Sequence, residues 1–367
     1  MLAFIGNVIA IILGTYLALV TNMADQISYY LDDPELETVV ENEELEQDEE
    51  ETIAEVPSKY EYGGALPDIL IKNAAFQKAS VIESLPAEAT TSSPNFNAVV
   101  NIYCTYKTDQ YIRTTTGTGF FVNSNGVILT NAHVAQFLLL KGLEGYGDPQ
   151  CVIRTGDVAT PSYLVDLLYI SPAWIQTNAD LISEATPKGT GERDYALLYI
   201  TSGINGEAIP ARLPSLPTHT ALLPVSAKNS PITIAGYPAG RLATEGPDTD
   251  ITLQTATSTI VDLFTFGSDY ADIFFVGGTN IGEHGMSGGP VINESGEAIG
   301  MISTRSDDEL LGAGSLNAIT VSYINRTIKE ETGFGFLENI SGNVPYRAKV
   351  FQATIVPFLT LMLGGEL

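Results

Sequence analysis

The chain has 367 residues and a formal net charge of −27, from 44 acidic and 17 basic residues. No basic cluster is available to neutralise phosphates, which argues against nucleic-acid binding and against electrostatic attachment to anionic lipid. The 34 glycines and 19 prolines, with only 17% charged residues, favour many turns and short strands over a helical bundle. Three histidines and two cysteines outside any C-x-x-C pair argue against a structural zinc site. We expect no metal and no cofactor.

Residues 1–21 begin the chain with an uncharged apolar run, Leu2–Val20. In a helix, nineteen residues span about 28 Å, close to the thickness of a bilayer core. The alternative is a cleaved signal peptide, which needs a basic start and a small-x-small cleavage site. No Lys or Arg precedes the run, and Asn22-Met23-Ala24 matches such a site only weakly. We therefore predict a transmembrane anchor at residues 1–21.

Residues 22–95 are predicted to be a spacer. Their part 32–55 is densely acidic and should stay solvated and extended through its own charge repulsion. The distribution of Lys and Arg does not fix the orientation of the anchor, because neither flank carries one. An acidic spacer suits a domain held away from an anionic bilayer, so we predict that the following domain is extracytoplasmic.

From residue 96 to 340, short runs rich in β-branched and aromatic residues alternate with turns. Expected strands span 98–106, 117–122, 127–132, 151–156, 195–200, 231–238, 251–264, 272–278, 289–293, 298–304 and 317–321. The turn Ser124-Asn125-Gly126 predicts a hairpin between the second and third. Short helices are expected from His133 to Lys141 and over 322–333. So many strands with so little helix predict an all-β fold of antiparallel barrels or a sandwich.

Three short segments carry residues suited to hydrolytic chemistry: TNAHV (130–134), DYALL (194–198) and GMSGGP (285–290). A serine hydroxyl is a poor nucleophile unless a neighbouring base takes its proton. A neutral imidazole does so when a carboxylate orients it. Glycines beside a serine permit backbone angles at which N–H groups converge on an oxyanion, here those of Gly285 and Ser287.

With these segments in the order His, Asp, Ser, the sequence resembles the trypsin-like serine peptidases of the chymotrypsin fold over roughly residues 97–330. Within them it is most similar to bacterial HtrA-like peptidase domains, without a PDZ domain after residue 340. The segments that carry the resemblance are GTGFFVNSNGVILTNAHV, DYALLYI, IAGYPAG and GMSGGPVIN. It implies His133 as general base, Asp194 as the carboxylate that orients it, and Ser287 as nucleophile.

The resemblance also implies two antiparallel six-stranded β-barrels, with a boundary near residues 205–228. It places Ile281 at the base of the substrate pocket and Met301 to Ser303 along one wall, with Glu283 pointing elsewhere. An apolar base implies a preference for aliphatic or small apolar side chains. Two departures stand out: Met286 occupies a position where the family usually has Asp or Asn, and an extra block spans residues 164–193.

Other residues of the same types compete for these roles. His219 and His284 are alternative bases, and Asp157, Asp166 and Asp180 are alternative carboxylates. His219 lies in a proline-rich loop and His284 within the nucleophile loop, while none of the three aspartates opens an apolar strand as Asp194 does. We therefore favour His133 and Asp194.

Cys104 and Cys151 fall on strands that can be neighbours in a closed six-stranded barrel. They form either a disulfide, which requires an oxidising compartment, or two buried thiols. We favour the disulfide.

The apolar C-terminal tail, residues 341–367, contains Pro357 and is too short for a confident membrane span. It should dock on the domain or touch the membrane surface. The sequence thus predicts a membrane-tethered serine endopeptidase acting on proteins or peptides. The alternative is a catalytically silent peptide-binding module of the same fold.

Overall fold

The structure is a computed structural model. It describes residues 61–65, 70–72, 76–80, 93–107, 111–143, 146, 149–182, 188–245, 249–305 and 315–364. The predicted anchor at residues 1–21 and the acidic run 32–55 lie outside the described residues. Within the described part of the chain, no helix is both long and apolar enough to cross a membrane.

The first barrel contains six antiparallel strands in the spatial order β5-β4-β7-β8-β10-β6, and pairing of β5 with β6 closes it. Its strands are β4 (Val99–Lys107), β5 (Tyr111–Phe121), β6 (Val127–Thr130), β7 (Gln150–Thr155), β8 (Thr160–Ile170) and β10 (Ala196–Gly203). The predicted hairpin is present, because the Val122 N–H donates to Val127 O across the Ser124–Gly126 turn. Strand β8 was not among the predicted strands.

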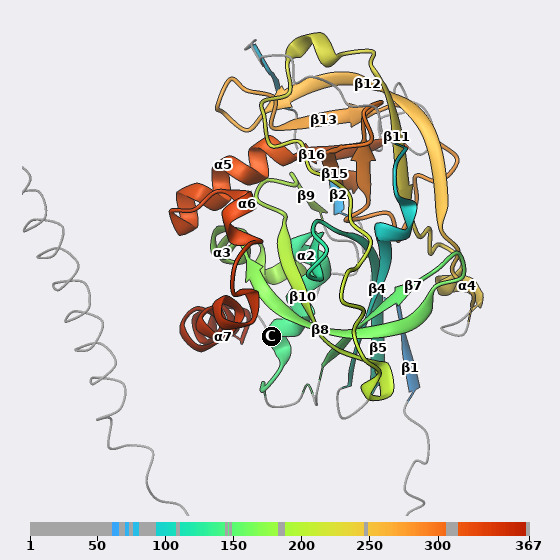
Figure 1. The fold of residues 1–367 in the computed structure, drawn as a ribbon, viewed down its shortest axis with the longest axis vertical. Coiled ribbons are helices and arrows are strands. Elements are labelled where there is room, and N and C mark those ends of the chain that lie inside the picture. The colour runs from blue at the N-terminus through green and yellow to red at the C-terminus, as the bar shows by residue number, and fades with distance from the viewer. Residues whose placement is uncertain are drawn as a thin grey trace, which may run out of the picture. The chain divides into compact units, whose positions relative to one another are not determined.

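The second barrel also contains six antiparallel strands, in the order β14-β11-β12-β13-β16-β15, closed by pairing of β14 with β15. Its strands are β11 (Pro231–Gly236), β12 (Gln254–Thr265), β13 (Ile273–Val276), β14 (Pro290–Ile292), β15 (Ala298–Arg305) and β16 (Leu316–Thr320). Figure 1 shows the two barrels one above the other, joined by the chain between β10 and β11. The predicted fold of two six-stranded barrels is confirmed.

Three short strands from the N-terminal part of the chain add to these barrels. Strand β1 (Glu61–Ala65) pairs in parallel with β5, and β3 (Gln77–Lys78) pairs with β12. Strand β2 (Leu70–Lys72) lies in parallel between β15 and β9 (Lys188–Gly189). All three lie in the stretch that we assigned to the spacer, and their described residues instead pair with the barrels.

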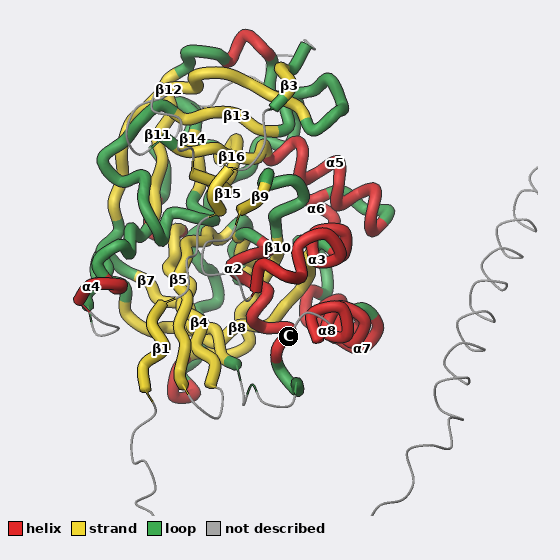
Figure 2. Tube along the Cα trace, turned by 180° about the vertical axis from the view of Figure 1, so that it is seen from behind, coloured by secondary structure: helices red, strands yellow, loops and turns green. Residues whose placement is uncertain are grey.

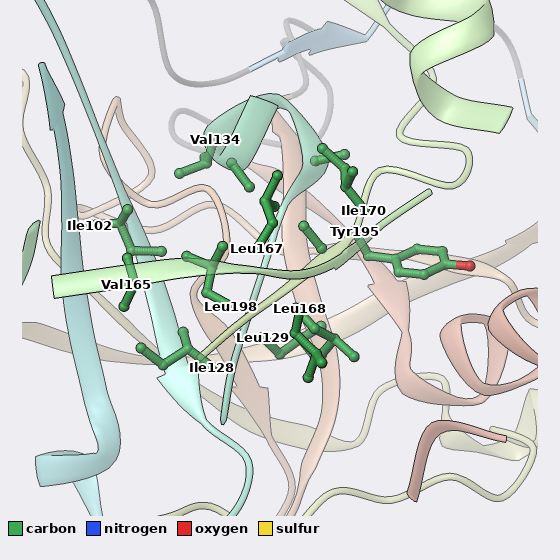
Figure 3. Close-up of a cluster of buried hydrophobic side chains, with 14 of the residues drawn as sticks. Ile102, Ile128, Leu129, Val134, Val165, Leu167, Leu168, Ile170, Tyr195 and Leu198 are labelled. Carbon is green, nitrogen blue, oxygen red and sulfur yellow. The ribbon is translucent and has the colours of Figure 1, made fainter. Parts of the chain in front are cut away.

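Apolar side chains alternate inward along the strands and fill the first barrel. Figure 3 shows Ile102, Ile128, Leu129, Val165 and Leu198 converging from β4, β6, β8 and β10. Burying such a side chain contributes about 1.5–3 kcal/mol relative to leaving it exposed. This core therefore fixes the strands whose ends carry the segments TNAHV and DYALL.

Helices gather on one flank of the barrels, as Figures 1 and 2 show. The helices on this flank are α3 (Pro172–Asn178) continued by η4 (Ala179–Ile182), α5 (Val321–Thr332), α6 (Phe336–Asn339), α7 (Val344–Thr354) and α8 (Val356–Gly364). Helix α4 (Leu242–Glu245) lies on the opposite side of the barrels. Helix α2 (Ala132–Ala135), continued by η3 (Gln136–Leu140), follows β6, and the short 3-10 turns are η2 (Phe96–Ala98), η5 (Ile204–Gly206) and η6 (Val225–Ala227). Helix α5 ends as predicted at Gly333, whose φ of +79° is the left-handed conformation that glycine adopts readily.

The apolar tail docks on the domain. Gln352 of α7 donates to the carbonyl of Leu167 in β8, and Thr360 of α8 donates to that of Leu139 in η3. Leu359 and Leu363 of α8 are buried against the domain.

Cys104 and Cys151 stand directly opposite each other on β4 and β7 and are joined by a disulfide bond. Both are almost fully buried in the first barrel.

Candidate active site

The imidazole of His133 is held where β6 turns into α2. Its Nδ1 lies 2.8 Å from Asp194 Oδ2, and its backbone N–H donates to Asp194 Oδ1 at 3.0 Å. Asn131, just before the helix, donates from Nδ2 to the backbone carbonyl of Asp194. Residues about 60 positions apart in the chain are thus brought together by pairing of β6 with β10.

Asp194 is completely buried, and its carboxylate meets a third donor from the second barrel. The Ser303 hydroxyl donates to Asp194 Oδ2 at 2.7 Å. Hydrogen bonds to a carboxylate are shorter and stronger than those between neutral groups, so three donors fix both the position and the rotation of this side chain. The remaining ring nitrogen of His133, Nε2, is the one not engaged with Asp194.

The loop that carries Ser287 packs directly on strand β5 of the first barrel. The Thr118 N–H donates to Ser287 O at 2.7 Å. A Cβ atom on Gly117 would lie 2.8 Å from Val134 Cγ2 and 3.3 Å from Ser287 O. Gly117 therefore contacts both the helix of His133 and the backbone of Ser287, and its lack of a side chain lets them approach. The Ser287 hydroxyl is buried and has no hydrogen-bond partner among the described residues.

Glycines set the shape of this loop. Gly285 has φ +93°, and a Cβ there would lie 2.2 Å from Tyr237 O. The N–H groups of Met286, Gly288 and Gly289 donate to backbone carbonyls. Within the described part of the chain, those of Gly285 and Ser287 donate to none of the backbone acceptors. The two N–H groups that the sequence assigned to an oxyanion hole are therefore not committed to a described backbone carbonyl.

The residues predicted to form the substrate pocket lie in different surroundings. Ile281 belongs to the apolar core of the second barrel and lines a pocket of about 240 Å³. Glu283 lines the same pocket together with Arg241 and Asp250, whereas Ser287, Met301 and Ser303 are not among its lining residues. The expectation that Glu283 points away from the substrate pocket stays a prediction. Met301 is fully buried, and the Ser303 hydroxyl is committed to Asp194.

His219 and the three alternative aspartates do not share this arrangement. His219 pairs with Glu297, its Nδ1 lying 3.3 Å from Glu297 Oε2. The carboxylate beside His133 is that of Asp194, and not that of Asp157, Asp166 or Asp180.

Sequence reasoning missed the contact of Ser303 with Asp194. The sequence carries no signal for it, because it depends on how β15 of the second barrel packs against the turn that precedes β10.

Two closed six-stranded barrels, with a buried His–Asp pair and a glycine-framed serine loop between them, define a chymotrypsin-like fold. The family model for the trypsin-like peptidase domain matches residues 117–301, about half of the chain, and the chain belongs to this family. Comparison with curated proteins found no match.

Proposed function

We propose that the chain is a serine endopeptidase that cleaves peptide bonds through an acyl-enzyme. Ser287 Oγ attacks the substrate carbonyl while His133 Nε2 takes the hydroxyl proton. The N–H groups of Gly285 and Ser287 stabilise the oxyanion. His133 then protonates the leaving amine. In the second half of the reaction, His133 takes a proton from the water that attacks the acyl group and gives it to Ser287 Oγ, which is released.

One observation carries this proposal: the buried bond between His133 Nδ1 and Asp194 Oδ2. A carboxylate at Nδ1 keeps the proton on that nitrogen, so Nε2 carries the lone pair that a base needs, and the carboxylate stabilises the imidazolium that forms. Membership of the trypsin-like peptidase family supports the reaction class.

Labelling with a fluorophosphonate probe tests the proposal. The wild-type chain should be labelled, and Ser287→Ala should abolish labelling and lower peptide turnover by about a million-fold. His133→Ala should cost about as much, because the two residues act as a unit. Ser258→Ala, on β12, is the matched serine control and should be labelled normally. A folded wild-type chain that binds peptides without being labelled would support the silent-module alternative instead.

The specificity follows from the same proposal. Ile281 at the pocket base favours aliphatic or small apolar side chains before the cleaved bond, in line with the resemblance to HtrA-like domains. A peptide-library profile decides: dominance of Lys and Arg would contradict the apolar preference.

We also propose that residues 1–21 anchor the chain in a membrane, with the peptidase domain outside the cytoplasm. The disulfide supports this placement, because such bonds persist in oxidising compartments. Protease added to intact or outer-membrane-permeabilised cells should release the domain at the acidic run 32–55. Degradation only after the inner membrane is lysed would overturn the orientation.

A further inference from the structure

The residue before Asp194 has an unusual backbone conformation. Arg193 has φ +55°, in the left-handed region, which costs a residue with a side chain about 1–2 kcal/mol. It lies in a tight turn, where the Asp194 N–H donates to Gly191 O and the Tyr195 N–H donates to Arg193 O. Such a conformation persists only where the surroundings hold it.

Helix α5 supplies that hold. The backbone N–H of Arg193 donates to the Tyr323 hydroxyl at 3.1 Å. Its guanidinium donates from Nη1 to Glu331 Oε1 at 2.8 Å and from Nη2 to Glu330 Oε2 at 3.0 Å. Arg193 thus contacts α5 through its backbone and through both ends of its guanidinium.

Glu331 is the centre of this contact. Its carboxylate also accepts hydrogen bonds from the hydroxyls of Ser171 and Tyr169. Ser171 in turn caps α3, accepting from the Trp174 N–H. Glu331 is 14% exposed, whereas Glu330 is 61% exposed. The bond from Arg193 to Glu331 is therefore connected to β8 and to the start of α3, while the bond to Glu330 lies in solvent.

The turn held in this way carries Asp194 and approaches Ser303. A Cβ on Gly191 would lie 2.8 Å from Ser303 Oγ, the atom that donates to Asp194. Helix α5 follows β16 of the second barrel, whereas the turn belongs to the first. The contact therefore links the barrel that supplies Asp194 to the barrel that supplies Ser287.

We propose that Arg193 and Glu331 are positioning residues, which hold the 191–194 turn so that Asp194 keeps His133 aligned with Ser287. This inference rests on the proposed function. A shift of about 1 Å in a catalytic group, caused at a distance, can lower the rate about 100-fold. The role is distinct from that of Ser303, which contacts the carboxylate itself.

Arg193→Asn tests the role without strain, because Asn tolerates the left-handed conformation but its side chain cannot reach Glu331 or Glu330. We expect kcat to fall at least about tenfold with KM nearly unchanged. Glu331→Gln should act in the same direction. The double variant should lose little more than either single one, because both remove the same contact. Glu330→Gln, which changes only the solvent-exposed bond to Arg193, is the matched control and should retain full activity.

Two further measurements separate positioning from a loss of stability. The acid limb of the kcat/KM–pH profile should move to lower pH in Arg193→Asn, because a displaced Asp194 stabilises the imidazolium less. The downfield NMR resonance of the His133 Nδ1 proton should also move, and it reports the bond to Asp194 even in a chain that hydrolyses nothing.

An unchanged kcat in Arg193→Asn would overturn the proposal. So would a loss of activity that follows the thermal midpoint, with the acid limb and the His133 resonance unmoved. Absence of fluorophosphonate labelling in the wild type would overturn the proposed function instead, and the NMR resonance would still decide whether Arg193 positions Asp194.

Discussion

Removing the bond between Cys104 and Cys151 should destabilise the first barrel by a predictable amount. The two residues are 47 positions apart. Closing a loop of that size lowers the entropy of the unfolded chain by an amount worth about 4 kcal/mol at 25 °C on the chain-entropy model. For a domain of this size that corresponds to a fall of roughly 8–16 °C in the midpoint of thermal unfolding.

The loss should also reach the proposed active site. Cys104 Sγ lies 4.0 Å from the carbonyl oxygen of Val134, the residue after His133. Loosening of β4 against β7 therefore acts on helix α2 directly. We expect activity to fall at temperatures below the new unfolding midpoint, before the barrel as a whole unfolds.

Thermal unfolding of the wild type with and without reductant measures the first effect, and peptide turnover over the same temperatures measures the second. The double variant Cys104→Ala/Cys151→Ala provides the same comparison without reductant. Alkylation of the denatured protein confirms the redox state in each sample. Equal alkylation with and without reductant, or equal midpoints after complete reduction, would refute the reasoning.

Three other variants test separate parts of the structure. Gly285→Ala should lower kcat at least about 100-fold, because a Cβ would meet Tyr237 O and move an oxyanion donor, while Gly142→Ala, also at positive φ but in open space, should keep full activity in the same assay. Ile71→Pro removes a backbone N–H from β2, which pairs with the edge of β15. Extended peptides that pair with the freed edge should then show a lower KM, and an unchanged KM would contradict this. Burial raises the pKa of Glu331 from its ordinary 4.5 to about 7, although Arg193 nearby favours the charged form. The folded wild type then binds more protons than the unfolded chain between these values, so its stability relative to Glu331→Gln should fall as pH rises from about 5 to 7, by at most about 1.4 kcal/mol per pH unit in urea unfolding.

The elements that the sequence predicted correctly are those with strong local signals. The turn Ser124-Asn125-Gly126 marks its hairpin, and Gly333 marks the end of α5. Strand β8 was missed because it begins with the exposed residues Thr160 and Pro161, and only its second half carries a continuous buried run. Strands β1, β2 and β3 depend on pairing with distant strands, and nothing local to residues 61–78 indicates it.

In the candidate site, too, the sequence predicted the residues with local signals and missed the contacts between distant segments. His133 and Asp194 could be paired from the sequence, because each adjoins a strand and the family pattern fixes their order. The contact of Ser303 with Asp194 and that of Arg193 with Glu331 could not, because they depend on how distant segments pack. Contacts between segments that far apart are set by the closed barrels and the docked helix α5, not by local spacing.

Thr118 shows why the proposed site requires both barrels. Its N–H donates to Ser287 O and its hydroxyl donates to Gly285 O at 2.6 Å. The Thr118 hydroxyl also accepts from the Tyr237 N–H, and the Thr118 carbonyl accepts from the Thr130 hydroxyl at the end of β6. One buried residue of the first barrel thus holds the serine loop of the second at two points and joins it to the strand that leads to His133. The second barrel alone would not place Ser287, and the Gly-Thr-Gly segment of β5 is needed as much for this contact as for the strand itself.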